Sequence, residues 1–187
     1  MLWLVTSALL ASSPTNDVGT PRPHLGIQLD VGFPAGAGVA VAFGPWQWLR
    51  FELGAAHNSA ATGVRGGLTL NPLRSVVRPT LSLHAGHFPK GNLGLVGRAL
   101  GAGETLGSSL FSSVEYDFVG AQLGVEIGAP SGVSGFVRGG IGRASARFLA
   151  TEEALREASG DPSLTARPLV LNLFVPSIQV GVSTPLL

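Results

Sequence analysis

Apolar and polar residues alternate along eight stretches of the chain. The clearest stretch runs from His24 to Phe33, where apolar residues occupy every second position and small or polar residues lie between them. Successive side chains of a β-strand point to opposite faces, so this period of two predicts a strand with one apolar face. The other stretches cover residues 38–43, 48–56, 64–70, 77–85, 119–127, 133–148 and 169–182. The pattern therefore predicts eight strands.

The eighth stretch changes phase in its middle. The odd-numbered residues from Leu169 to Val175 are apolar, whereas after Pro176 the even-numbered residues, beginning with Ile178, are apolar. Proline cannot donate a hydrogen bond to a neighbouring strand and is found at strand edges and bulges. We therefore expect the odd-numbered residues of this segment to face outward, with a β-bulge at Pro176 that shifts the pattern by one.

The connections between the stretches alternate between two kinds. Three connections are tight and rich in turn-forming residues, at residues 44–47, 71–74 and 129–132. The others vary in length, and the long ones cover residues 87–113 and 149–167. Short turns at one end and longer loops at the other are typical of bacterial outer-membrane barrels. Within the second long loop, residues 151–158 are expected to form a short helix that Thr151 caps.

Composition indicates the same architecture. Apolar residues make up 45% of the 187 residues, charged residues only 12%, and the mean hydropathy is +0.37. Yet no apolar run of about 18 residues, the length of a transmembrane helix, follows the first dozen positions. Only helices and closed barrels satisfy every backbone hydrogen bond inside lipid. We therefore predict an all-β protein, an eight-stranded antiparallel up-and-down transmembrane β-barrel over residues 24–187.

The amino-terminal segment, residues 1–13, resembles a secretory signal peptide, because a short apolar core is followed by small residues. No lysine or arginine precedes that core, so an ordinary first strand stays open as the alternative. The loose polar stretch at residues 14–23 is expected to form a short periplasmic leader before the barrel.

The polar faces of the predicted strands would line the inside of such a barrel. They carry charges of both signs, and the interior of an eight-stranded barrel is just wide enough for side chains to fill. Buried charges are costly unless they are paired, so we expect ion pairs in the lumen. The candidate residues are Asp30, Arg50, Glu52, Arg65, Arg78, Glu126 and Arg138.

The expected strand register predicts which of these charges meet. If residues 57–60 form a tight hairpin, Glu52 falls opposite Arg65. Arg78 and Glu126 both lie near the tight-turn end of adjacent strands, so a contact between them is expected as well. Such pairs predict a plugged lumen, and a gated path for ions or water is the alternative.

Several kinds of chemistry are disfavoured. The chain has no cysteine, which excludes disulfides and thiolate metal sites, and its formal charge of +1 gives no reason to expect nucleic acid as a partner. His84 and His87 have opposite strand parity, and no third metal ligand is near them in the sequence. The glycine-rich segments lack the ending of a phosphate-binding loop. We therefore expect no metal, no cofactor and no enzymatic activity.

One short motif, His57-Asn58-Ser59, resembles a catalytic element. It is similar to the His-x-Ser element of outer-membrane lipid A 3-O-deacylases, in which the histidine and serine act with a glutamate on the lipid-facing surface. Residues 65–71 provide no acid for that role here. A serine without an oriented base is poorly activated. We therefore expect a polar hairpin loop, with a lipid-modifying enzyme as an alternative.

Six segments carry a wider resemblance to known proteins. They are Leu29–Pro34, Trp48–Arg50, His57–Asn58, Gly63–Gly67, Val77–Leu81 and Tyr116–Val119. In these segments the chain resembles small outer-membrane barrels of the OmpA/OmpX transmembrane type, and more narrowly the uncharacterised barrel proteins of Gram-negative, high-GC bacteria such as myxobacteria. The resemblance implies a monomer in the outer membrane that contacts lipid and lipopolysaccharide and, through its outer loops, envelope proteins.

Four functions stay open at this point. The first is a structural or surface-presenting barrel whose long loops contact partners. The second is a narrow pore for ions or small solutes, and the third is the lipid-modifying enzyme. The fourth is a soluble ligand-binding barrel, which would have its apolar residues inside. The mixed charges on the inward faces favour the first, a non-enzymatic barrel with a largely plugged lumen.

Overall fold

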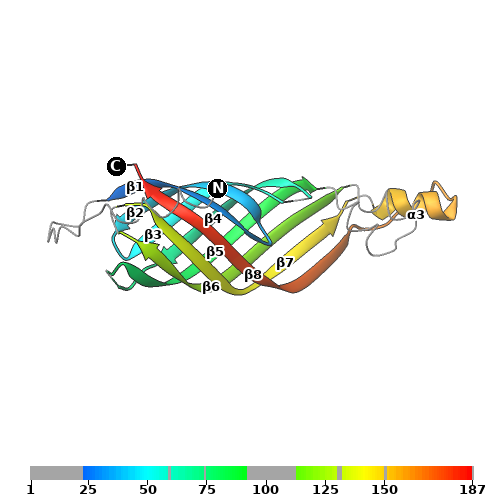
Figure 1. Cartoon of the computed structure of the whole chain (residues 1–187). Coiled ribbons are helices and arrows are strands. Elements are labelled where there is room, and N and C mark those ends of the chain that lie inside the picture. The colour runs from blue at the N-terminus through cyan, green and yellow to red at the C-terminus, as the bar shows by residue number, and fades with distance from the viewer. Residues whose placement is uncertain are drawn as a thin grey trace, which may run out of the picture.

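The computed structural model describes residues 23–58, 60–73, 75–91, 113–129, 132–149 and 151–186. In these ranges eight antiparallel strands close into a barrel (Figure 1), in which each strand pairs with its neighbours in the chain and the last strand pairs with the first. The predicted all-β fold with up-and-down connectivity is confirmed. The predicted signal peptide at residues 1–13, nearly all of the predicted leader and most of the long loop at residues 87–113 lie outside the described residues.

The strands differ in length between the two halves of the chain. They are β1 (His24–Phe33), β2 (Gly36–Trp46), β3 (Leu49–His57), β4 (Thr62–Leu70), β5 (Val77–Gly91), β6 (Val114–Gly128), β7 (Ser134–Phe148) and β8 (Leu169–Pro185). The first four strands have 9 to 11 residues and the last four have 15 to 17. The wall is therefore taller along β5 to β8.

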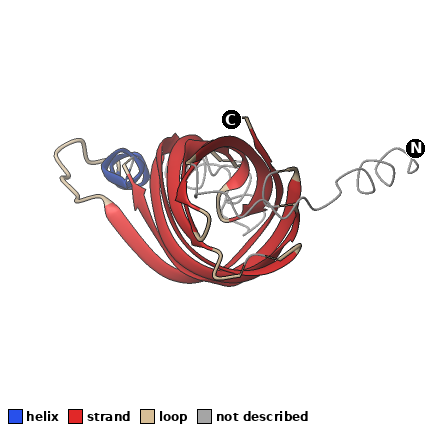
Figure 2. Ribbon diagram, turned by 90° about the vertical axis from the view of Figure 1, so that its left-hand side faces the viewer, coloured by secondary structure: helices blue, strands red, loops and turns tan. Residues whose placement is uncertain are grey.

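The two ends of the barrel differ in their connections. We call the end with the predicted tight turns, where β8 finishes, the turn end, and the opposite end the loop end. The long strands extend toward the loop end, and the helix α3 (Thr151–Ser159) lies beyond them (Figure 1). Viewed along the barrel, the strands form a closed ring and α3 lies to one side of it (Figure 2).

Hydrogen bonds connect the start of α3 to both of the strands that it links, β7 and β8. The Thr151 hydroxyl donates to the Phe148 carbonyl at 2.7 Å and accepts the Leu169 backbone N–H at 3.1 Å. Thr151, predicted as a helix cap, thus joins β7 to β8. Gly160, with a φ of 69°, ends the helix and donates to the Arg156 carbonyl at 2.9 Å.

A tight polar turn follows the helix. The Ser163 hydroxyl donates to the Asp161 carboxylate at 2.7 Å, and the Ser163 backbone N–H donates to the same oxygen at 2.9 Å. These hydrogen bonds favour the ionised carboxyl group and lower the pKa of Asp161 below its ordinary value.

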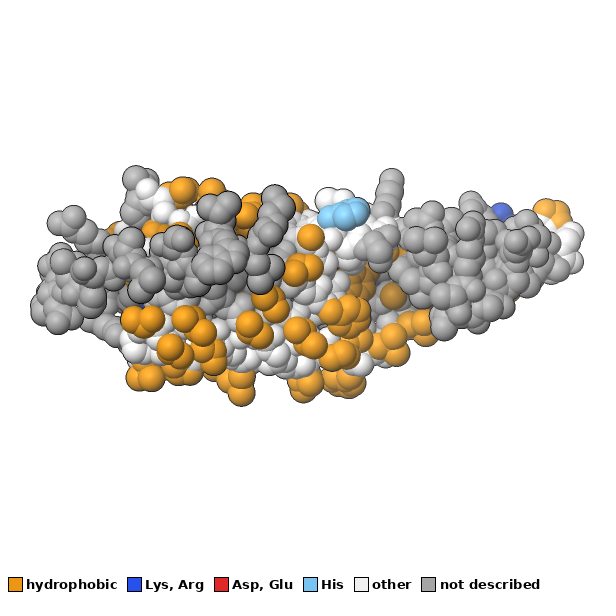
Figure 3. Space-filling view, viewed as in Figure 1, with side chains coloured by type: hydrophobic (Ala, Val, Ile, Leu, Met, Phe, Trp, Pro, Cys, Tyr) orange, Lys and Arg blue, Asp and Glu red, His pale blue; other side chains and the backbone are white. Residues whose placement is uncertain are grey.

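Apolar side chains cover the outside of the barrel. Leu53, Leu123 and Ile141 are each 68–70% exposed, and Figure 3 shows hydrophobic side chains over the visible wall. We call this outward surface the apolar belt. In β5 it extends from Val77 to Ala85, roughly nine residues, which is the length that a tilted strand needs to cross a hydrocarbon core. The predicted alternation, apolar outward and polar inward, is confirmed in these strands.

At the loop-end margin of the belt and beyond it, the outward faces of β5 to β7 become charged. The residues are His87, Glu115, Asp117, Arg143 and Arg147, and we call them the charged row. His87 Nδ1 lies 2.7 Å from a carboxylate oxygen of Asp117, and Arg147 donates to Glu115 at 2.8 Å. The long strands thus rise above the apolar belt.

The predicted β-bulge at Pro176 is wrong. The β7–β8 register runs without interruption, and Pro176 lies opposite Ile141. Phe174 therefore shares the outward face with Ile178, and Leu171 and its odd-numbered neighbours point toward the inner side. The physical reason is that β8 pairs with β1 only from Ile178 onward. Before Ile178, β8 extends past the loop-end terminus of β1, so both faces of this part of the strand are exposed. Apolar residues therefore do not show there which face points outward.

Candidate functional site: the polar lumen

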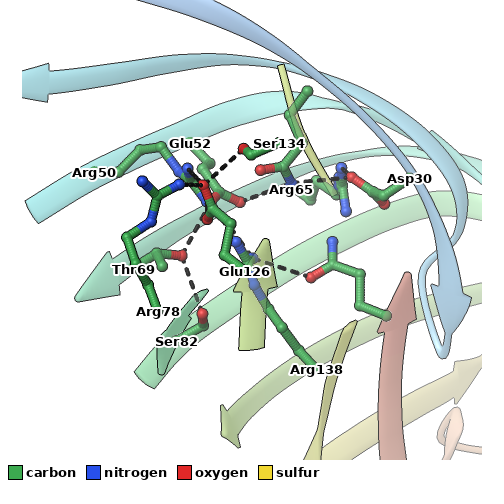
Figure 4. Close-up of polar contacts among 12 residues, drawn as sticks. Asp30, Arg50, Glu52, Arg65, Thr69, Arg78, Ser82, Glu126, Ser134 and Arg138 are labelled. Carbon is green, nitrogen blue, oxygen red and sulfur yellow. Dashed lines mark hydrogen bonds and ion pairs between the residues drawn. The ribbon is translucent and has the colours of Figure 1, made fainter. Parts of the chain in front are cut away.

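Polar and charged side chains fill the turn-end half of the lumen. The barrel is narrow, so inward side chains from non-adjacent strands meet there. The buried members include Gln28, Arg50, Thr69, Arg78, Ser82, Glu126, Ser134 and Arg138. Figure 4 labels all of these except Gln28 and shows the labelled side chains pointing toward one another from several strands.

Glu126 on β6 is the centre of the first cluster. It is 2% exposed and accepts two hydrogen bonds from Arg50, at 3.2 and 2.9 Å. Arg78 on the adjacent strand donates to it at 2.8 Å, and so does the Ser134 hydroxyl. The predicted contact between Arg78 and Glu126 is present, because the register places them directly opposite each other. The role of Arg50 as a second partner was not predicted.

Glu52 on β3 is the centre of the second cluster. Arg50 donates to it at 3.2 Å, and the Thr69 hydroxyl donates at 3.0 Å. The Gln28 amide donates at 3.0 Å and Arg138 at 3.4 Å. Arg50 therefore contacts both carboxylates and connects the two clusters. Four strands contribute partners to this one carboxylate.

Asp30 on β1 is the carboxylate nearest the loop end in this network. Arg65 forms an ion pair with it, and the Gln28 amide donates to the same Asp30 oxygen at 3.1 Å. Gln28 also donates to Glu52, so its amide group bridges the two carboxylates. The side chain of Asp30 is 1% exposed, which makes this pair part of the buried network.

The predicted contact between Glu52 and Arg65 is wrong. Glu52 lies opposite Gly67, and Arg65 lies opposite Gly54, so the register differs by two residues from a tight hairpin. The side chains share the inward face, but the shift brings Arg65 to Asp30 across the lumen.

Asn58 explains that shift. Its side-chain oxygen accepts the backbone N–H groups of Ala60 and Ala61 at 3.0 and 2.8 Å, and its own N–H donates to the Ala61 carbonyl at 3.0 Å. This turn lets the ladder close at His57 and Thr62, instead of nearer the loop tip.

Arg138 on β7 is enclosed on all sides. Its side chain is 1% exposed, and its guanidinium carbon lies 4.1 Å from the centre of the Phe136 ring. It donates to Gln179 at 3.3 Å as well as to Glu52.

Gly124 lies opposite Arg138 on β6, and a Cβ there would meet the Val137 carbonyl oxygen and come within 2.7 Å of the Arg138 Cγ. The glycine therefore provides the space for the arginine stem.

The network carries more positive than negative charge. In the part of the lumen that the structure describes, four arginines face three carboxylates: Arg50, Arg65, Arg78 and Arg138 against Asp30, Glu52 and Glu126. The voids beside Arg65 and His84 measure about 20 Å³ each, room for about one water molecule. The side chains of this network therefore pack closely around Arg65 and His84.

Aromatic side chains form a cluster in the loop-end half of the lumen, which we call the aromatic plug. Phe88 is fully buried, and its ring centre lies 5.4 Å from that of Tyr116 and 6.1 Å from that of Phe118. Ala56 and Ala61 pack against them. This aromatic plug was not predicted from the sequence, although Phe88 and Phe118 have the even-numbered, inward parity of their strands.

The two neighbouring histidines point to opposite sides, as predicted. His84 faces the lumen, where its Nε2 lies 3.1 Å from the Ser177 hydroxyl, and Gln122 donates to that hydroxyl at 2.8 Å. His87 belongs to the outward charged row. The described residues contain no group of three or more acidic, histidine or cysteine side chains that could hold a metal.

The His-x-Ser motif is only partly visible. His57 is exposed at the loop end, and its Nδ1 lies 2.9 Å from the Thr62 hydroxyl, the residue paired with it across the hairpin. Ser59 lies outside the described residues.

Comparisons with known proteins found no match: no family model, no curated protein and no solved structure is significantly similar to the chain. Among the described residues, no helix is long and apolar enough to cross a membrane.

Proposed function

We propose that this chain is an outer-membrane β-barrel with a plugged lumen and a structural or surface-presenting role, without catalysis of its own. One observation carries the proposal: the wall is apolar on the outside, while the inside holds a buried ion-pair network. A soluble ligand-binding barrel would need the opposite arrangement. The resemblance to OmpA/OmpX-type barrels and the signal-like residues 1–13 support the same compartment.

The two margins of the apolar belt support insertion into a membrane. At the turn end, Trp46 and Trp48 stack with ring centres 5.5 Å apart, and each is about half exposed. Tryptophan is enriched where a membrane meets water. At the loop end, the charged row begins at the margin of the belt. Lipid, including lipopolysaccharide in the outer leaflet, is the partner that this surface fits.

The plugged lumen supports a structural role over transport. An ion would have to separate Arg50 from Glu126 and also displace Phe88 and its aromatic neighbours. The long strands support a presenting role, because they place α3 and the part of β8 that has no β1 partner beyond the loop-end margin of the belt. Envelope proteins or external molecules would meet the barrel there, and we propose a monomer as the inserted form.

Membrane fractionation with heat-modifiable gel mobility tests the architecture and the compartment together. We expect the chain in the outer-membrane fraction, with faster migration before boiling than after it. Recovery of the folded chain without detergent would contradict the proposal and favour the soluble barrel.

Planar-bilayer recording tests the plugged lumen. We expect no steady conductance from the natural chain. A steady conductance that is abolished by Arg65→Ala would instead identify a narrow pore. Mass analysis of lipid A tests the enzymatic alternative: we expect no modification, and a modification lost in Ser59→Ala would contradict a non-catalytic role.

A further inference from the structure

Arg143 of β7 and Phe174 of β8 are direct cross-strand neighbours on the outward face. Both are exposed, and Phe174, at 85%, has the highest exposed fraction among the large hydrophobic residues of the described barrel. Toward the turn end they are followed by Ile141, which is 70% exposed and part of the apolar belt. The pair therefore lies at the margin where the belt ends and the charged row begins.

Arg143 differs from the other charges of the row. His87 contacts Asp117, and Arg147 forms an ion pair with Glu115, so each of these side chains has an acidic partner. Arg143 donates to the neutral side-chain oxygen of Asn172 at 3.2 Å. Within the described residues no carboxylate lies within 4 Å of it. Its positive charge is thus held in place but left without a counter-charge.

The surroundings of Arg143 define what would neutralise it. At the margin of a membrane-embedded belt, the anions at hand are the phosphate groups of lipids, and guanidinium binds phosphate through paired hydrogen bonds. An exposed aromatic ring beside it offers an apolar surface to the first carbons of a hydrocarbon chain. A phosphate joined to acyl chains matches both residues, whereas a free phosphate matches only the arginine.

We propose that Arg143, positioned by Asn172, binds the phosphate of an anionic lipid of the outer leaflet, whose acyl chain packs against Phe174. This inference rests on the proposed outer-membrane location. It adds a defined lipid site at the loop-end margin of the apolar belt.

The test uses the full chain refolded in detergent, with binding of lipid A measured by native mass spectrometry. Diphosphorylated lipid A and fully dephosphorylated lipid A are compared, because they share the same acyl chains. We expect the natural chain to bind the phosphorylated form roughly tenfold more tightly, the size of one charge-assisted contact. Arg143→Gln is expected to remove that preference.

Arg147→Gln is the matched control. Arg147 is also an outward arginine of β7, but it already has a carboxylate partner, Glu115. This substitution is expected to change the preference by less than about threefold, as for an exposed ion pair. Asn172→Ala keeps the charge of Arg143 but frees its guanidinium group, and we expect a partial loss of the preference. Inorganic phosphate at millimolar concentration is expected not to compete.

Equal binding of the two lipids would overturn the inference, and so would equal losses in Arg143→Gln and Arg147→Gln, which would indicate diffuse attraction. Competition by inorganic phosphate would identify a free-anion site. Heat-modifiable mobility is recorded for every variant. Absence of a barrel in the natural chain would count against the proposed function, whereas an intact barrel without lipid preference would overturn this inference alone.

Discussion

Arg50 on β3 binds both carboxylate oxygens of Glu126 on β6, with N–O distances of 3.2 and 2.9 Å. The two strands are not neighbours, because β4 and β5 lie between them in the barrel. The ion pair therefore connects separate parts of the wall through the lumen. Both side chains are buried, so water can replace either partner only if the strands that carry them move apart.

Glu126→Gln is expected to destabilise the barrel strongly. The substitution leaves the guanidinium groups of Arg50 and Arg78 buried without that carboxylate. Breaking a buried pair by removing one partner costs about 3–5 kcal/mol. The free energy of unfolding by urea, measured on the chain inserted in lipid vesicles, checks this value. The control is Glu115→Gln, which removes an exposed pair with Arg147 and is expected to cost about 0–1 kcal/mol. Equal costs would contradict the connecting role of Glu126.

A double-mutant cycle between Asp30 and Arg65 is expected to give a coupling energy of about 1–3 kcal/mol, because the two side chains form a buried ion pair. The cycle uses Asp30→Asn and Arg65→Met, each alone and together, with unfolding free energies as the measurement. A parallel cycle between Glu52 and Arg65 is expected to give a smaller value. Stronger coupling in the second cycle would restore the tight hairpin register that the sequence predicted.

Gly124→Ala is expected to cost about 1–3 kcal/mol, the range for overpacking a filled interior. The added methyl group would meet the backbone of Val137 and the stem of Arg138, and backbone cannot move aside cheaply. Gly139→Ala is the matched control on β7, because a Cβ there meets nothing within 4 Å. It is expected to lie within about 0.5 kcal/mol of the natural chain. Similar costs at both positions would show that the lumen has unused space at Arg138.

Single cysteines along β8 are expected to separate its two parts. The chain has no cysteine of its own, so each introduced thiol is the only one. Cysteines at Asn172 and Leu173, on opposite faces, should both react with a membrane-impermeant maleimide, because both faces are exposed there. A cysteine at Val180, on the apolar belt, should be protected once the barrel is in lipid vesicles. Protection at one of the first two positions would indicate that a further element covers that face.

The barrel was predictable because the alternation of apolar and polar residues that specifies its strands is a local pattern. Alternation along a strand such as β1 depends on neighbouring residues alone, and the Arg78–Glu126 contact follows from two strands whose ladder begins close to both residues. The arrangement of Arg65 was not predictable in the same way. Its partner depends on two residues of register, which the side chain of Asn58 determines in a short loop.

The phase of β8 was misread for a different reason. Alternation of apolar and polar residues shows which face of a strand points outward only where the barrel buries the other face. Leu171 and Leu173 lie where β8 has no β1 partner, so burial no longer determines which face carries the apolar residues. The aromatic plug was not predicted because Phe88 and Phe118 lie just outside the predicted stretches 77–85 and 119–127, whereas β5 and β6 extend further toward the loop end.

The unequal strand lengths divide the barrel into two half-shells, β1–β4 and β5–β8, that meet along two seams. At one seam β4 pairs with β5 only from Val64 to Leu70, and at the other β1 pairs with β8 only from Gly26 to Phe33. Within the taller half-shell, the β6–β7 and β7–β8 ladders extend along whole strands. Thermal opening is therefore expected to start along the seams, with the β5–β8 half-shell as the last unit to exchange its amide hydrogens.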